Sequence, residues 1–341
     1  MALRKIFQLM TVSALMISWG CSSFKKDIDI GVKLTQKNHQ VEILIGDKPF
    51  TTYYYGAESP KPYLHPLRTP GGIIVTRGFP MQDDIPGEAK DHPHHRALYF
   101  AHGNVNGVDF WSEGKSHGTR KVETVEGRQF VSEGMPHGRT VFKEILTLNS
   151  GKESGRLSVL FELTGPNNNV IAEQIQTYTF WAHPTLRTID CEYTFRAGSN
   201  PVKLGDTKEG TFAIRVAQEL TQSSGARMVS SQGGVGEEQI WGKPAHWVDY
   251  TGSFEGKKIG IAILDHPGNF RHPTYWHARG YGLFAANPFG EHDFFADPER
   301  DGSVTLAPGE NLTLRYRVII HPGTPDDAHI VERYQKYQAI K

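Results

Sequence analysis

The sequence predicts an all-β protein, a large antiparallel β-sandwich with a short C-terminal helix. Short runs in which polar and apolar residues alternate recur along the 341 residues, and this period of two is that of a half-buried strand. The 36 Gly and 20 Pro residues punctuate these runs with turns. The sequence lacks the strand–helix–strand alternation typical of parallel sheets, so two packed antiparallel sheets are expected.

The clearest strand patterns are Val41–Ile45, Gly71–Val75, Arg156–Leu163, Ile175–Phe180, Thr188–Phe195 and Leu312–Ile319. The C-terminal segment from Pro325 to Gln338 is the one with a helical pattern, with acidic residues near its start and apolar residues spaced by three. Two long loops, Phe79–Arg96 and Gly225–Trp247, have little strand pattern, and such loops are usually functional or disordered. The first leads into a histidine-rich segment, which favours function. The second contains a glycine-rich stretch typical of flexibility, and the sequence assigns it no role.

The N-terminus has the pattern of an export signal. Arg4 and Lys5 precede the mostly apolar run Ile6–Trp19, which is short for a membrane span, and Gly20 and Cys21 then offer a small residue followed by a cysteine. We predict a signal peptide over 1–20, a tether over 21–30 and one β-sandwich domain over 31–341, because no Pro/Ser-rich linker divides it. Cys21 would carry a lipid anchor in the periplasm or at the cell surface, although Ser18 and Trp19 depart from the usual signal.

Composition excludes several classes of protein. The chain has 2 Cys, so lipidation of Cys21 would leave Cys191 without a partner, and the core alone would have to stabilise the fold. Lys+Arg 37 balance Asp+Glu 37, and no global basic field favours nucleic acid. We therefore expect no nucleic-acid partner, and contact with a membrane only through the anchor at Cys21.

Two dense clusters of polar residues are the strongest functional signal. The segment from Asp91 to Gly103 holds four histidines, and a second cluster runs from Asp265 to Arg279. Histidine is the side chain whose proton moves near neutral pH, so this concentration indicates acid–base chemistry or metal binding in a shared site. The alternative is that the histidines only pack or cap loops.

Within the second cluster, Tyr275, His277 and Arg279 are spaced by two and would share one face of a strand. A phenol, an imidazole and a guanidinium on one face are difficult to explain as packing. In the first cluster, His92, His94 and His102 could hold a metal, but no recognised metal motif supports this, and we predict no metal and no cofactor.

Two further segments carry candidate groups. Glu209 is a plausible acid or base and Arg215 a plausible carboxylate clamp, although a solvated charged turn is also consistent with this segment. Asp109 could orient a histidine or bind sugar hydroxyls, and Trp111 could either stack on a sugar ring or belong to the core.

A family resemblance rests on Asp91–Arg96, Asn106–Trp111, Asp206–Gly210, Arg271–His277 and Leu283–Gly290. These segments resemble the bacterial PmoA-family domain over most of the mature chain. That family's label, methane oxygenase, does not apply, because a methane monooxygenase subunit needs several transmembrane helices. The resemblance implies an exported, mutarotase-like supersandwich that acts as a dehydratase on oligosaccharides ending in uronic acid, notably those of ulvan.

Removing water from a terminal uronic acid requires neutralisation of its carboxylate, a base near C5 and an acid at the leaving hydroxyl. The expected catalytic residues are His92, His95, His102, Glu209, Tyr275 and His277. The expected residues binding the acidic oligosaccharide are Arg96, Asp109, Trp111, Arg215, His272, Arg279 and Asn287. The alternatives are a glycoside hydrolase, with Glu209 and Asp109 as its carboxylates, and a sugar-binding lipoprotein without activity.

Overall fold

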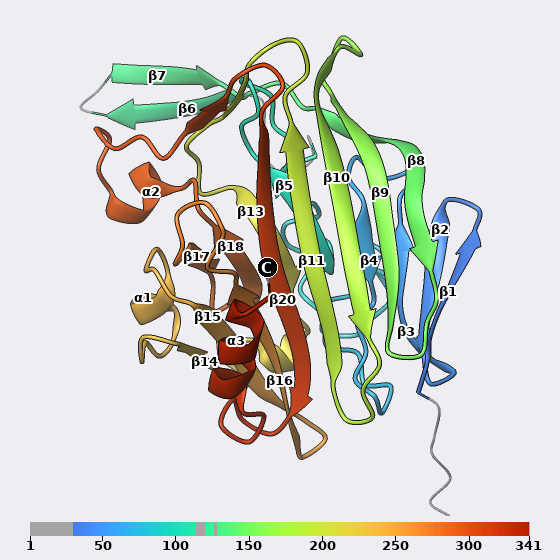
Figure 1. Ribbon diagram of the computed structural model, residues 1–341. Helices are drawn as coiled ribbons and strands as arrows, with labels where there is room; N and C mark the ends of the chain where they lie inside the picture. The colour runs from blue at the N-terminus through green and yellow to red at the C-terminus, as the bar shows by residue number, and fades with distance from the viewer. Residues whose placement is uncertain (1–29, 114–119, 126–127, 341) are drawn as a thin grey trace, which may run out of the picture.

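The structure, a computed structural model, describes residues 30–113, 120–125 and 128–340. The predicted signal peptide, Cys21 and all of the tether except residue 30 lie outside the described residues. Two eight-stranded antiparallel sheets pack face to face, which confirms the predicted all-β sandwich (Figure 1).

The first sheet has the strand order β1-β2-β3-β4-β5-β13-β18-β17. Its strands are β1 (Val32–Lys37), β2 (Gln40–Ile45), β3 (Lys48–Tyr54), β4 (Tyr63–His65), β5 (Leu98–His102), β13 (Gly210–Arg215), β18 (Leu283–Asn287) and β17 (Tyr275–Ala278). Its second half joins segments from distant parts of the chain, so it brings the two predicted clusters onto one sheet, at β5 and β17 with β13 and β18 between them.

The second sheet has the order β14-β15-β16-β20-β11-β10-β9-β8. Its strands are β14 (Arg227–Ser230), β15 (Trp247–Phe254), β16 (Lys257–Asp265), β20 (Asn311–Pro322), β11 (Arg187–Arg196), β10 (Val170–Trp181), β9 (Ser154–Thr164) and β8 (Arg139–Asn149). Two small ladders pair β12 (Val202–Leu204) with β19 (Val304–Leu306), and β6 (Arg120–Val125) with β7 (Arg128–Glu133).

Helices are short and lie outside the sandwich. They are α1 (Glu237–Ile240), α2 (Glu291–Phe295), α3 (Ile330–Gln338) and the 3-10 turns η1 (Gln218–Leu220) and η2 (Gln222–Ser224). Helix α3 lies across the outer face of the second sheet (Figure 1), where Tyr334 and Tyr337 join Leu264 and Ile319 in a small apolar cluster. Within the described part of the chain, no helix is both long and apolar enough to cross a membrane.

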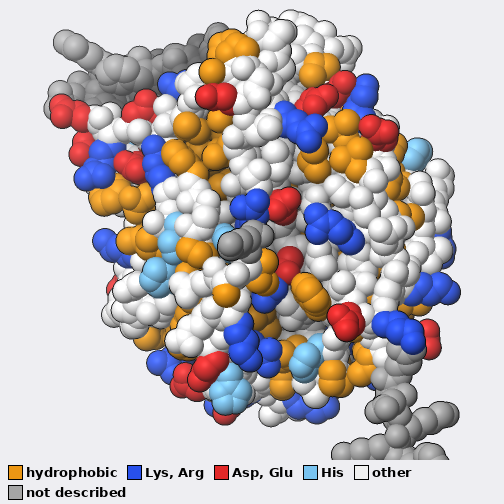
Figure 2. Space-filling model, in the orientation of Figure 1, with side chains coloured by type: hydrophobic (Ala, Val, Ile, Leu, Met, Phe, Trp, Pro, Cys, Tyr) orange, Lys and Arg blue, Asp and Glu red, His pale blue; other side chains and the backbone are white. Residues whose placement is uncertain are grey.

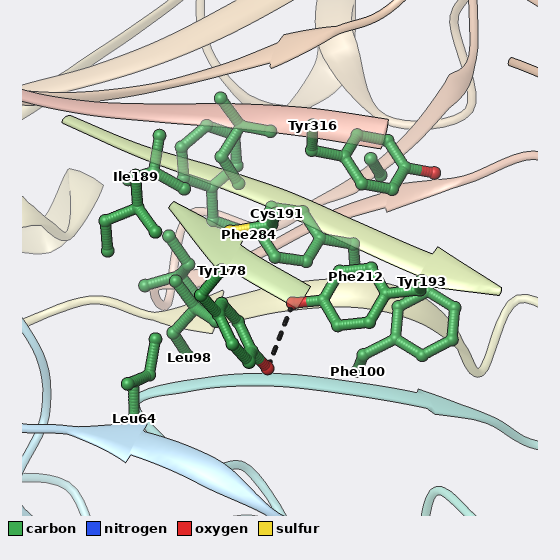
Figure 3. Packing of buried hydrophobic residues seen from close by; sticks show 14 of the residues in the cluster. Leu64, Leu98, Phe100, Tyr178, Ile189, Cys191, Tyr193, Phe212, Phe284 and Tyr316 are labelled. Carbon is green, nitrogen blue, oxygen red and sulfur yellow. Dashed lines mark hydrogen bonds between the residues drawn. The ribbon is translucent and has the colours of Figure 1, made fainter. Parts of the chain in front are cut away.

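The core fills the space between the sheets because alternate residues of each strand point inward. In β11 the alternation is regular, and every second side chain from Arg187 to Phe195 is buried. Figure 3 shows the aromatic packing that results, with Phe100 of the first sheet stacked on Tyr193 of the second at a centroid distance of 4.0 Å. Cys191 is buried in this core, and its thiol is free.

A buried polar network also links the sheets. The hydroxyl of Tyr53 in β3 donates to Oε1 of Gln176 in β10 at 3.0 Å, and the hydroxyl of Tyr178 donates to the same oxygen at 2.9 Å. The side chain of Gln176 is completely buried and donates in turn to Gln174 at 2.7 Å. Each polar atom is therefore paired inside the apolar core, as burial requires.

Five of the six predicted strands are confirmed, and Gly71–Val75 is wrong. That segment contains a turn at Gly72, whose φ is +89°, and one isolated bridge, between Ile74 and Arg68; the next residue, Thr76, forms another with Val216. The helix predicted from Pro325 begins only at Ile330, because residues 325–329 form turns and His329 adopts a left-handed conformation with φ 52°. The segment Gly225–Trp247, expected to be a loop, contains the short strand β14 and the short helix α1, and the rest of it is irregular.

Surface charge is mixed rather than segregated on the face that carries α3. Figure 2 shows Lys and Arg side chains interspersed with Asp and Glu over this face. The balanced composition is therefore also balanced locally here.

Candidate functional site

The candidate site lies on the outer face of the first sheet, which we call the site face. In β17, Trp276 and Ala278 point into the core, so Tyr275 and His277 point to the site face. The register places His277 opposite Ala285 of β18, Ala285 beside Ala213 of β13, and Ala213 beside Tyr99 of β5. Small alanine side chains thus separate an imidazole at one end of this row from a phenol at the other.

The loop Phe79–Arg96 is fastened over this face by Arg77. The buried Arg77 guanidinium donates to the backbone carbonyls of Phe79, Ala89, Asp91, His92 and His95 and to the Asp91 carboxylate. Five carbonyls gathered by one guanidinium fix the path of an otherwise irregular segment. Nothing in the sequence near Arg77 predicts this role, because no local pattern indicates that one arginine binds carbonyls so far apart along the chain.

Asp91 orients His92 within this loop. Nδ1 of His92 lies 2.7 Å from an Asp91 carboxylate oxygen, so it carries the hydrogen and leaves Nε2 as the lone-pair nitrogen. Burial opposes ionisation of Asp91, but hydrogen bonds from His92 and Arg215 together with the charge of Arg215 hold its pKa well below its usual range. The His92 side chain is 39% exposed, so its free nitrogen can meet a ligand.

The two predicted clusters meet at Tyr281. Its ring stacks on His92 at a centroid distance of 5.3 Å, while the guanidinium of Arg215 lies 4.6 Å and that of Arg279 5.8 Å from its centroid. Burial raises the pKa of Tyr281 to about 12, so the phenol remains a hydrogen-bond donor at neutral pH. Sequence reasoning missed this residue, although it continues the spacing by two that runs from Tyr275 through His277 and Arg279.

His277 is a neutral imidazole with one nitrogen committed. Its Nδ1 donates to the backbone carbonyl of Lys208 at 2.8 Å, so Nε2 carries the lone pair. Burial, aided by the charges of Arg279 and Lys208, lowers the pKa of His277 to about 4 despite that hydrogen bond. His277 is therefore held as a base at neutral pH.

Glu209 follows Lys208 directly, and its pKa is shifted in the opposite direction to that of His277. Burial raises the pKa of the Glu209 carboxyl, and the nearby carboxylates of Asp109 and Asp293 add to this rise against the charge of Lys208. Gly103 makes room for it, because a Cβ there would lie only 2.8 Å from the Glu209 Cβ. The site face thus carries a neutral imidazole at His277 and, in the residue after the carbonyl that binds it, a carboxyl with a raised pKa, and these two groups are suited to act as base and acid.

Arg279 lies at the rim of the site face. Its Nε forms an ion pair of 3.0 Å with Glu237, and its side chain is 34% exposed. Beside it is a cleft of about 700 Å³ between the site face and the segment around α1, lined by residues that include Gln222, Glu237, Trp241 and Tyr281. The segment Gly225–Trp247, to which the sequence assigned no role, thus forms one wall of this cleft.

Several predicted binding residues are committed to the protein itself. Arg96 forms a two-point ion pair with the buried Glu113, at 3.0 and 2.5 Å, so it does not face a ligand. Arg215 is only 2% exposed and donates to Asp91 and to Nδ1 of His95. The expected carboxylate clamp at Arg215 is thus wrong in its role, since this guanidinium positions the loop instead.

The segment Asn106–Trp111 also has a structural role. Oδ1 of Asp109 accepts the backbone N–H groups of Trp111 and Ser112, and its other oxygen accepts the Ser112 hydroxyl. Trp111 is completely buried against Tyr99 at a centroid distance of 5.0 Å, so it packs in the interior rather than stacking on a sugar. The core alternative weighed for Trp111 is the correct one.

The remaining predicted residues are either buried or face another part of the protein. His102 points inward with Nε2 2.9 Å from the Gly205 carbonyl, because it has the same strand parity as Phe100. Asn287 is fully buried and bonds to the backbone of Thr207 and Phe289. His95 is 1% exposed and lies beneath His92, with nearly parallel rings 4.7 Å apart. His272 faces helix α3 rather than the site face.

Among the described residues, no group of three or more His, Cys, Asp or Glu side chains is placed to hold a metal ion. The trio considered from the sequence, His92, His94 and His102, therefore does not converge. Of the predicted site residues, the site face gathers His92, Glu209, Tyr275, His277 and Arg279.

The chain belongs to a family of unknown function, DUF6807, whose profile matches residues 40–335. No curated protein matches the sequence.

The fold is similar to that of several solved structures at low identity. A putative aldose 1-epimerase from Klebsiella pneumoniae has 10% identity and a TM-score of 0.42 over 90% of this chain and 87% of its own. A galactose mutarotase-like protein from Clostridium acetobutylicum has 10% identity and a TM-score of 0.43 over 86% and 99%. An alpha-galactosidase from Geobacillus stearothermophilus has 11% identity and a TM-score of 0.38 over 86% of this chain and 41% of its own. At these levels the similarities transfer no activity.

Proposed function

We propose that the protein is an exported carbohydrate-active lyase, a dehydratase. It would remove water from the uronic acid at the non-reducing end of acidic oligosaccharides and leave an unsaturated uronic acid. The observation that carries this proposal is that the site face carries both a neutral His277, bonded to the Lys208 carbonyl, and in the next residue a Glu209 carboxyl whose pKa is raised. The resemblance of the sequence motifs to PmoA-family dehydratases of ulvan-type oligosaccharides supports the same reaction class.

In the proposed reaction, Nε2 of His277 takes the proton from C5 of the sugar. The C5–H electron pair becomes the C4=C5 double bond, and the C4 hydroxyl leaves as water after accepting the proton of the Glu209 carboxyl. Histidine ends as imidazolium and glutamate as carboxylate, and one proton passing between them through solvent restores both. No oxidant or reductant is needed.

The C5 proton is weakly acidic, so the adjacent carboxylate must be neutralised as negative charge develops. Arg279 is the predicted clamp that best fits this task, because it is partly exposed and lies two residues from His277 on the same face. Tyr275 and Tyr281 are phenols whose pKa values are raised, in both cases chiefly by burial. They would donate hydrogen bonds to sugar oxygens. His92, which is held by Asp91 and stacked on Tyr281, is a further candidate acid or base.

The test is incubation of the purified protein with uronic-acid-ended oligosaccharides, with and without chelator. Absorbance of the conjugated unsaturated acid should rise, and mass spectrometry should find the intact oligosaccharide minus one water. At a temperature well below unfolding, the chelator should not reduce turnover, since the proposed acid and base are protein side chains and not a metal ion. Cleavage into shorter sugars, or tight binding without turnover, would instead identify the hydrolase or the binding lipoprotein.

The hydrolase alternative has lost one of its predicted carboxylates. Asp109 is occupied by two backbone N–H groups and the Ser112 hydroxyl, so it is not available to pair with Glu209. The observed geometry therefore favours one acid and one imidazole base over two carboxylates.

Recognition of the acidic group can be tested at Arg279. Arg279→Lys should raise KM for acidic oligosaccharides about 10-fold or more, because a point charge cannot reproduce two-point contact with a carboxylate. Arg196→Lys, at an exposed arginine of β11, is the matched control and should leave KM unchanged. Equal affinity of the unmodified protein for acidic and neutral sugars would remove Arg279 from substrate recognition.

A further inference from the structure

A second cluster of polar side chains lies away from the site face, beside helix α3. It consists of His246 ahead of β15, His272 ahead of β17 and Tyr334 on α3, and we call it the His–His–Tyr trio. Nδ1 of His246 lies 3.1 Å from Nε2 of His272, and the Tyr334 oxygen lies 3.3 Å from each of these nitrogens. Two ring nitrogens and one phenol oxygen from distant segments thus form a nearly equilateral triangle.

A buried carboxylate fixes the tautomer of His272. Asp265, at the end of β16, is completely buried, and its Oδ2 lies 2.7 Å from Nδ1 of His272 and also accepts the Thr274 N–H at 2.9 Å. Its other oxygen accepts the Asn269 amide at 2.7 Å. Nδ1 of His272 therefore carries the hydrogen, and its Nε2 presents a lone pair to the triangle.

When His272 is neutral, hydrogen bonds can pair at most two of the three contacts in this triangle. Its three contacts share at most two hydrogens, one on Nδ1 of His246 and one on the Tyr334 hydroxyl, because Nε2 of His272 has none. If both hydrogens point at the single lone pair of His272, the contact between His246 and Tyr334 has no hydrogen. The distances of 3.3 Å are also long for O–H···N hydrogen bonds.

We propose that the His–His–Tyr trio binds a zinc ion, with Nδ1 of His246, Nε2 of His272 and the Tyr334 oxygen as ligands. Tetrahedral zinc with bonds of about 2.0 Å separates its ligand atoms by about 3.3 Å, which agrees with all three contacts. Asp265 takes the position of the carboxylate that orients a metal-bound histidine. A tyrosinate and this carboxylate together would balance the two charges of the ion.

The fourth position would be open to water. His246 and His272 are partly exposed, and the His272 side chain is 13% exposed, so an ion can enter from solvent. Two of its three ligands are histidines and the third is a phenol, a less common zinc ligand than His, Cys, Asp or Glu. Its place beside α3 indicates a stabilising role, in which the metal ties the C-terminal helix to two loops of the sandwich.

The experiment measures zinc binding by the full protein after treatment with chelator and desalting. Isothermal titration with zinc chloride should give one tight equivalent, and metal analysis after a second desalting should recover it. Tyr334→Phe keeps the ring and removes only the ligand oxygen, so it should abolish retention of that equivalent. Asp265→Asn should weaken binding about 10- to 100-fold, as loss of a carboxylate behind a metal-bound histidine does.

The matched control is His329→Gln, at a histidine whose side chain is 70% exposed just ahead of α3. This variant should retain the tight equivalent, which separates the trio from adventitious binding by surface histidines. Zinc should raise the thermal midpoint of the unmodified protein and of His329→Gln but not of Tyr334→Phe. Failure of the unmodified protein to retain one equivalent, or undiminished retention by Tyr334→Phe, would overturn the proposal.

Discussion

At the scale of single residues, burial has opposite effects on the two groups proposed to move protons. It lowers the pKa of His277 to about 4 and raises the pKa of Glu209, because in both cases it penalises the charged form. A neutral imidazole is a base and a protonated carboxyl is an acid. Burial thus favours the neutral form of both groups, which is the form that an elimination requires of its base and of its acid.

Substitution of His277 tests its role as base. His277→Ala should lower kcat by about 10²- to 10⁴-fold, the usual contribution of a positioned base. Tyr275→Phe, which removes a hydroxyl from the same face, is likewise expected to abolish most activity. His277→Gln offers a control for the fold, since its amide can still donate to the Lys208 carbonyl; full turnover by it would exclude His277 as the base.

The pH dependence of kcat/KM tests the pair together. Activity should fall as the pH drops through about 4, where His277 gains a proton, and fall again as the pH rises through the raised pKa of Glu209. Glu209→Gln should lose about 10²- to 10⁴-fold in rate and should also lose the alkaline limb. An alkaline limb that persists in the residual activity of this variant would assign the acid to another group.

At the scale of elements, buried ion pairs hold the segments that frame the site. Arg96 at the end of the histidine loop and Lys61 ahead of β4 share the carboxylate of Glu113, which has a fully buried side chain. The Lys61 ammonium also lies 4.7 Å from the ring centroid of Tyr99. Two segments around β5 are thereby fixed on the side of the sheet that carries Tyr99, which is the site face.

Removal of this shared carboxylate should be costly. Glu113→Gln would leave two buried cations without a counter-charge, and we expect the free energy of unfolding to fall by about 3–5 kcal/mol. Denaturant unfolding measures this. Although burial opposes ionisation, Lys61 and Arg96 lower the pKa of Glu113, so its stabilisation is present above the unfolded-state pKa and is lost as the pH falls through the lower folded value. A variant equally stable at neutral pH would contradict the assignment.

The sequence predicted elements and faces better than it predicted partners. Alternation is local, so the strands and the shared face of Tyr275 and His277 followed directly from spacing. The partner of Arg96 lies 17 residues away and that of Arg215 lies 124 residues away, and no local pattern reveals that these guanidinium groups are already satisfied. Glu113, Tyr281 and the trio around His272 were missed for the same reason, because their significance depends on strand order.

At the scale of the whole molecule, the two sheets are joined by an apolar core with a polar network inside it. The sandwich buries Gln176 completely, and both Tyr53 of the first sheet and Tyr178 of the second donate to its side-chain oxygen. Because the hydroxyls of Tyr53 and Tyr178 are buried, each of them needs this acceptor to avoid a desolvation penalty. Their directional pairing also fixes how the two sheets are placed relative to each other.

Gln176→Leu tests this link, since it keeps the approximate volume and removes both the oxygen and the nitrogen of the amide group. It should lower the free energy of unfolding by about 2–4 kcal/mol, because two buried hydroxyls lose their acceptor. Tyr53→Phe removes one donor only and should cost about 0.5–1.5 kcal/mol. In denaturant unfolding the double variant should lose less than the sum of the two changes, since both act on one bond. A strictly additive result would mean that the network does not couple the sheets.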